Sequence, residues 1–182
     1  VAAPLAAADH VQAATHSPGA AGALYQTDLE IRADGGAASS VRLDYLEMNR
    51  DNSTPLATTT VAVPAGGAVR LLDLVEDTFG LGSSTGALRL TTLSGTPTFQ
   101  SRTSNVGPFL TYGFDIPASR AGDEVTSARP GRLIGLSGDG DHRTNLGFVN
   151  TSGIPVDVQA DLYRGDGTFY GTVTRTLLPF DV

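Results

Sequence analysis

An internal repeat constrains the fold of this 182-residue chain more than any other feature of the sequence. The segment Tyr25–Ile31 (YQTDLEI) resembles His142–Phe148 (HRTNLGF), at an offset of 117 residues. The match continues without a gap through the pairs Gly36 and Gly153, Val41 and Val158, and Asp44 and Asp161. Because self-similarity at a fixed offset marks repeated structural units, the sequence predicts two related units in tandem.

Each copy is expected to contain the same strands and turns. Val11–Thr15 aligns with Arg132–Leu136, and after a short difference in length Thr58–Pro64 aligns with Val173–Pro179. Between these segments apolar residues alternate, which is typical of half-buried strands. The alternating residues are Leu29 and Ile31, then Val41, Leu43 and Tyr45 in the first copy, and Leu146 and Phe148, then Val158, Ala160 and Leu162 in the second.

The first copy carries additional elements. Apolar residues between Val69 and Phe79, followed by Gly80, predict a short helix of about two turns near residues 70–79. Ala87–Thr92 and Thr98–Thr103 read as two strands, and Tyr112–Phe114 as one more.

The predicted fold class is therefore all-β, with two related β-sandwich-like units and one short helix in the first. We expect the first unit over residues 1–116, a linker over 117–130, and a shorter second unit over 131–182. The second copy has no counterpart of the helix and of the two strands that follow it. Three ways of covering its exposed edges remain open: packing against the first copy, completion by another chain, or a sequence cut short.

Charge and composition exclude several classes of function. The net charge of −7 is spread thinly, which argues against binding to nucleic acid or to anionic membrane surfaces. The chain has no Cys, so it has neither disulfides nor thiolate sites, and it has no apolar run of the roughly 20 residues of a membrane helix. It begins at Val1 with an Ala-rich stretch, as a processed chain would, and we expect a secreted or cell-surface protein.

Several short segments resemble a family of tandem β-sandwich domains of uncertain function in bacterial secreted and surface proteins. They are Tyr25–Leu29, Val63–Gly67, Gly86–Leu90, Ser101–Asn105 and Arg143–Asn150. The resemblance implies a β-sandwich fold and carries over no catalytic residue.

Candidate catalytic groups are few, and we expect no enzyme activity. The histidines are His10, His16 and His142, and a Gly-x-Ser-x-Gly nucleophile motif is absent from the sequence. The acid Asp28 recurs as Asn145 in the second copy, which favours a structural role for this position.

Asp139 and Asp141 are the candidate metal ligands, since they form a compact oxygen-rich turn before His142. Calcium is the cation that such oxygens suit, although two carboxylates fall short of its six to eight oxygen ligands. Asn49, Asp51 and Asn52 form a second polar loop. Turn formation explains both loops equally well, and otherwise no cofactor is expected.

Three further groups of residues have a structural and a functional interpretation. Arg102 is expected to be a solvent-facing strand residue rather than a ligand-binding one. The aromatic residues are expected to fill the core rather than to bind carbohydrate. These are Tyr112, Phe114, Tyr163, Phe169 and Tyr170. Asn52 and Asn150 match the glycosylation acceptor pattern, to which we attach little weight.

The sequence thus favours a non-enzymatic extracellular structural or adhesive protein that associates with itself or with other surface proteins by strand complementation. The Ala-rich segment Val1–Ala8 is the candidate donor strand. The alternative is an accessory module that binds a glycan or a peptide, with or without calcium. A hydrolase centred on Asp141 and His142 is a third hypothesis.

Overall fold

The computed structural model describes residues 7–19, 22–107, 110–138 and 144–182. These residues form an almost entirely β structure, as the alternating sequence pattern predicts. Its strands are β1 (Asp9–Pro18), β2 (Leu24–Asp34), β3 (Ser39–Glu47), β4 (Ala57–Val63), β5 (Ala68–Leu71), β6 (Ser84–Ser94), β7 (Thr96–Val106), β8 (Thr111–Ile116), β9 (Val156–Tyr163) and β10 (Phe169–Leu177).

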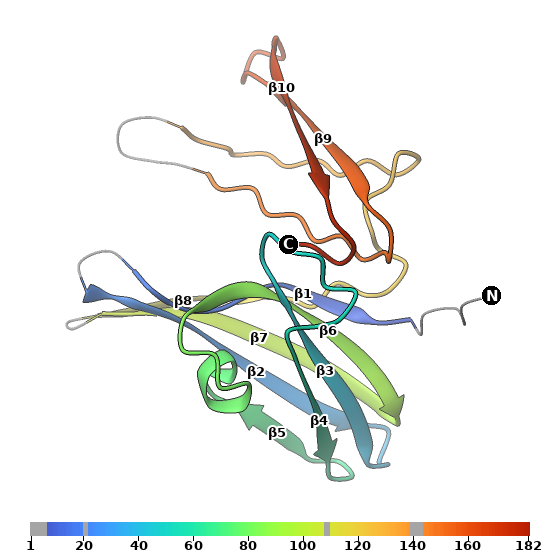
Figure 1. Ribbon diagram of the computed structural model, residues 1–182. Helices are drawn as coiled ribbons and strands as arrows, with labels where there is room; N and C mark the ends of the chain where they lie inside the picture. The colour runs from blue at the N-terminus through green and yellow to red at the C-terminus, as the bar shows by residue number, and fades with distance from the viewer. Residues whose placement is uncertain (1–6, 20–21, 108–109, 139–143) are drawn as a thin grey trace.

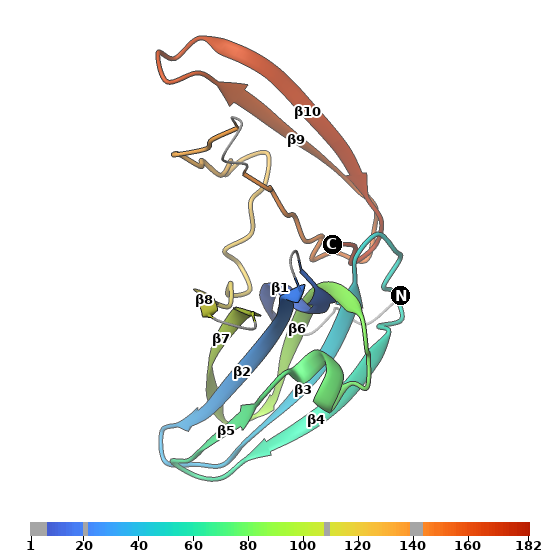
Figure 2. The same cartoon turned by 90° about the vertical axis from the view of Figure 1, so that its left-hand side faces the viewer.

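Strands β1 to β8 form one large antiparallel sheet in the order β4-β3-β6-β1-β2-β7-β8, with β5 paired to β2 (Figure 1). Strand β1 joins two halves of this sheet. It pairs with β6 between Asp9 and His16, and with β2 between His16 and Pro18. A register shift between Val11 and Ala14 marks a bulge in β1. Because bulges increase bending and twist, the two halves curve toward one another (Figure 2).

The core lies inside this curved sheet. Alternate residues of β2 and β3 point inward, and their side chains are buried together with residues of β1, β4 and β6. They include Leu29, Ile31, Val41, Leu43, Tyr45, Leu88 and Leu90, each at most 1% exposed. Burial of Tyr45 raises the pKa of its hydroxyl to about 12. The alternation predicted for the first copy is therefore confirmed.

The expected two-turn helix near residues 70–79 is shorter in the structure. The chain forms β5 at Ala68–Leu71 and then a single π-helical turn at Leu74–Thr78. Asp73 precedes the turn with a positive φ of 39°, which ends the extended backbone. Leu74 and Val75 enter the core while Glu76 and Asp77 stay exposed, so one turn suffices to bury the apolar residues that suggested a helix.

The second copy folds only in part. Its β9–β10 hairpin corresponds to β3–β4, but residues 131–137 and 144–150 form no strand. The strands expected at Leu133–Leu136 and around Leu146 and Phe148 are therefore wrong. Their counterparts in the first unit are β1, which pairs with β6, and β2, which pairs with β7. No counterparts of β6 and β7 are found among the described residues of the second copy, so these segments lack their partner strands.

The register of the second hairpin corrects the alignment of the two copies. In the first unit Asp44 lies opposite Thr58, and in the second Asp161 lies opposite Thr172. Thr58 therefore matches Thr172 rather than Val173. The buried Val63 then matches Leu177, which is also buried.

The C-terminal residues attach the second hairpin to the first unit. Asn52 is fully buried. Its side-chain Nδ2 donates to the carbonyl oxygen of Phe180 at 3.0 Å, and its backbone N–H donates to the carbonyl oxygen of Pro179 at 2.9 Å. The guanidinium of Arg89 lies over the Phe180 ring at 4.7 Å. In the described part of the chain, no helix has the length and apolar character needed to cross a membrane.

Candidate interaction site at the second hairpin

Both outer edges of the second hairpin are unpaired among the described residues, but only that of β9 differs from the first unit, where β4 is terminal as β10 is. In the described residues β9 pairs with β10 alone, whereas its counterpart β3 is flanked by β4 and β6. In Figure 2 residues 117–138 and 144–150 lie on the β9 side of the hairpin. The open edge of β9 therefore faces the segment that corresponds to β1.

In the first unit the equivalent edge is closed around a buried carboxylate. Asp44 is 1% exposed and accepts hydrogen bonds from Thr58 Oγ1 at 2.8 Å and from Arg42 Nε at 3.2 Å. Its third partner is Arg89 of β6, whose Nε lies 2.9 Å from Asp44 Oδ2. Arg89 is only 8% exposed, so β6 brings to this edge a cation that is buried together with Asp44.

The second hairpin repeats this arrangement without the third partner. Asp161 Oδ1 accepts from Thr172 Oγ1 at 2.7 Å and from Gln159 Nε2 at 3.0 Å, where Thr58 and Arg42 stand in the first unit. These hydrogen bonds, that from Thr172 first, lower the pKa of the Asp161 carboxyl. Asp161 is thus an exposed anion at the position where its counterpart meets Arg89.

A second hydrogen bond of the first unit also recurs. Thr27 Oγ1 accepts from the backbone N–H of Thr15 in β1 at 3.0 Å. In the second copy Thr144, the counterpart of Thr27, accepts from the N–H of Ser137 at 2.9 Å. The segments that correspond to β1 and β2 therefore contact each other in the second copy too, but the donor is one position after Leu136, the counterpart of Thr15, and neither segment is a strand.

Apolar side chains around the open edge are uncovered. Ile134 is 95% exposed and Leu133 66% exposed on the segment that corresponds to β1. The five aromatic residues expected in the core are exposed as well, each by 59–66%, so that prediction is wrong. Tyr112 and Phe114 lie on β8, the edge strand of the curved sheet, and the other three lie at the tip of the second hairpin. Tyr163 and Phe169 pack only edge to face, with ring centroids 5.7 Å apart.

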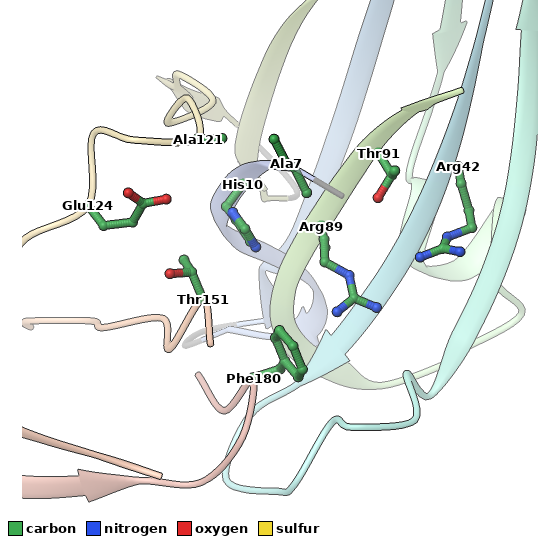
Figure 3. A pocket seen from close by; sticks show the side chains of 10 residues that line it. Ala7, His10, Arg42, Arg89, Thr91, Ala121, Glu124, Thr151 and Phe180 are labelled. Atoms are coloured by element: carbon green, nitrogen blue, oxygen red, sulfur yellow. The ribbon is translucent and has the colours of Figure 1, made fainter. Parts of the chain in front are cut away.

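A separate cavity of about 200 Å³ lies where the first sheet meets the C-terminal residues (Figure 3). His10, Arg89, Glu124 and Phe180 are among its lining residues. His10 is 5% exposed, and its Nε2 has no hydrogen-bond partner among the described residues. Burial, and then the charge of Arg89, lower the pKa of His10, so its imidazole is neutral near pH 7.

The remaining histidines and the predicted metal ligands occupy other places. Asp139, Asp141 and His142 lie outside the described residues. Elsewhere the described residues hold no group of three or more side chains suited to a metal. His16 Nδ1 lies 2.8 Å from Asp73 Oδ2, beside the π-helical turn, and links β1 to that turn.

Other polar candidates have structural partners. Asp28 Oδ1 accepts from the N–H of Asp73 at 3.0 Å, and its Oδ2 accepts from Arg70 at 2.8 Å. Arg102 is a half-exposed residue of β7 beside Asp115, as expected of a solvent-facing strand residue.

The two asparagines of the glycosylation patterns are buried. Asn52 is fully buried and Asn150 is 5% exposed. Asn150 Nδ2 donates to the carbonyls of Ile154 and Leu178 at 2.7 and 2.8 Å. Neither amide is accessible in the folded protein.

Sequence reasoning did not single out Asp161 or His10 as members of a site. The signal for Asp161 was present, since the repeat aligns it with Asp44, but the role of Asp44 depends on Arg89, which is 45 residues away. No local signal marks His10, because Glu124 and Phe180 reach the same cavity from distant parts of the chain.

Comparison with known proteins shows the fold alone. No family model matches the chain, and no curated protein matches it. A crystal structure of Thermotoga maritima 1070 is similar in fold, with a TM-score of 0.50 at 13% identity. The match covers 65% of this chain and 97% of that one.

Proposed function

We propose that this chain is a non-enzymatic, extracellular structural or adhesive module that assembles by strand complementation. Its second unit accepts a strand from another polypeptide, either a further copy or another surface protein. The observation that carries the proposal is the open edge of β9, whose counterpart β3 is paired on both sides. An extended segment can bind to an unpaired strand edge through main-chain hydrogen bonds.

The uncovered apolar surface supports the same function. Leu133, Ile134, Leu136 and Leu146 are 38–95% exposed on the two segments beside the hairpin. Burying apolar surface contributes about 25 cal/mol per Å², so an added strand that covers these side chains stabilises the complex.

Light scattering with negative-stain microscopy tests the proposal. We expect association as the concentration of the protein rises, because the unpaired edge of β9 then meets other copies of the chain more often. The variant Leu162→Lys places a charge on β9 and is expected to abolish association. The matched variant Phe114→Lys, on the edge strand β8, is expected to leave it unchanged.

Hydrogen exchange tests separately whether the edge of β9 is unpaired. The amides of β9 that face the open edge should exchange faster than those of β3, which are paired on both sides. A compact monomer near 18.8 kDa, with β9 amides as well protected as those of β3, would overturn the proposal.

A second candidate function is binding of a small ligand in the cavity beside His10. The unpartnered Nε2 of this buried imidazole favours it, because a buried polar atom lacking a partner is costly. A thermal-shift screen with glycans, short peptides and calcium tests this function. Ligands that stabilise the protein but not its His10→Phe variant would support it, and a screen without hits would reject it.

A further inference from the structure

We infer that the open edge of β9 takes a strand of defined chemistry: an extended segment, antiparallel to β9, with a cationic residue between two large apolar residues. The cation pairs with Asp161, and the apolar residues cover Ala160 and Leu162. This inference rests on the proposed function and names the partner that the site selects.

The register follows from the first unit. There β6 runs antiparallel to β3, with Arg89 opposite Asp44, Leu90 opposite Leu43 and Leu88 opposite Tyr45. The repeat places Ala160, Asp161 and Leu162 at the positions of Leu43, Asp44 and Tyr45. A segment that reads apolar-Arg-apolar, as Leu88–Leu90 does, therefore meets the same three positions on β9.

The charge of Asp161 favours a donor strand that carries a cation. The hydrogen bonds from Gln159 and Thr172 hold the Asp161 carboxylate in place, as those from Arg42 and Thr58 hold Asp44. The carboxylate is thus oriented before a strand arrives, and an arriving Arg completes the set of partners that Asp44 has. Adding a strand also removes Asp161 from water, which is unfavourable without a cation beside it.

The segment that corresponds to β1 could be a second neighbour of the added strand. In the first unit β6 is flanked by β3 and by β1, and Leu88 lies opposite Val11. In the second copy the counterpart of β1 is the exposed segment 131–137, which includes Ile134. An added strand that contacts this segment would also give it the partner strand that it lacks.

These requirements discriminate among donors. The segment Val1–Ala8 (VAAPLAAA), considered above as a donor, contains no cation and has a proline that cannot donate to a ladder. It leaves Asp161 unpaired. The peptide that matches all positions is the sequence of β6 itself, Ser84–Ser94 (STGALRLTTLS).

Fluorescence anisotropy with this labelled peptide tests the inference on the full chain. We expect saturable binding that weakens roughly 10- to 100-fold with the protein variant Asp161→Arg, since a charge-assisted hydrogen bond contributes that much. A peptide with Arg89→Glu should also bind the original protein more weakly, and should bind Asp161→Arg better than the original peptide does. That recovery shows that Asp161→Arg is folded. The control Asp77→Arg makes the same charge change on the π-helical turn and should not alter binding.

Disulfide cross-linking locates the peptide, because the chain has no cysteine of its own. In the β3–β6 register Arg42 lies opposite Thr91, so a protein with Gln159→Cys should cross-link to a peptide with Thr91→Cys. Thr174→Cys, on β10 opposite Gln159, is the matched control and should not.

The outcomes separate this inference from the proposed function. If the protein associates through β9 but neither captures the peptide nor responds to Asp161→Arg, the inference is wrong and the proposed function stands. If the protein stays a compact monomer and its β9 amides are as protected as those of β3, both are wrong. Equal cross-linking at Gln159→Cys and Thr174→Cys would overturn the assigned edge.

Discussion

The hairpins β3–β4 and β9–β10 have the same local structure and opposite surroundings. Each pairs an aspartate with a threonine across the strands, Asp44 with Thr58 and Asp161 with Thr172, at 2.8 and 2.7 Å. Yet Asp44 is 1% exposed and buried, whereas Asp161 is exposed. The difference lies in β6, which places Arg89 beside Asp44, and in Phe180, whose ring packs against that guanidinium. Strand pairing and hydrogen bonds within a hairpin are thus local, while the burial of its residues depends on the neighbouring strand.

The largest expected effect contrasts the two aspartates. Asp44→Ala leaves the buried Arg89 without its carboxylate partner and should lower the free energy of unfolding by about 3–5 kcal/mol. Asp161→Ala should leave it unchanged, because that carboxylate is exposed and lacks a cation. Urea unfolding of both variants measures the contrast. Equal losses would mean that the second hairpin is as enclosed as the first.

Variants of two buried asparagines distinguish the contacts between the two units from the contacts within the second unit. Asn52→Ala removes donors to the carbonyls of Glu47 and Phe180 and should cost about 1–3 kcal/mol. It should also speed the hydrogen exchange of the backbone amides of residues 180–182. The matched variant Asn150→Ala, which loses bonds within the second copy, should loosen residues 150–154 and leave the Asn52 loop unchanged. Loosening of the Asn52 loop in both variants would contradict this separation.

The smallest effect concerns His10, which lies on β1 and has no histidine counterpart in the second copy. Its pKa in the folded protein is below the ordinary value of 6.5, so the unfolded chain binds more protons as the pH falls below 6.5. Stability is therefore expected to decrease from pH 6.5 downward, until the folded-state pKa is passed. His10→Gln should flatten this part of the curve of unfolding free energy between pH 5 and 8. Parallel curves for the two proteins would show that His10 is not the group responsible.

Much of the first unit could be predicted from its residues. Alternation at Leu29 and Ile31 and at Val41, Leu43 and Tyr45 located β2 and β3 and the residues that they bury. The helix was overestimated, because apolar residues at Leu71, Leu72, Leu74 and Val75 suit a strand end followed by one turn as well as a helix. The aromatic residues were misplaced, because their number indicates a core but not which strands enclose one.

The sequence alone determined the internal repeat and the two hairpins, because the repeat is visible in the residues themselves and the strands of a hairpin are close together in the chain. Only the tertiary structure decided which copies of the pattern become buried strands. Residues 131–137 resemble β1 and residues 144–150 resemble β2, yet they stay outside the sheet. A strand needs backbone partners on its edges, and those partners come from distant segments. Asp44 and Asp161 differ for the same reason: Arg89 reaches only one of them.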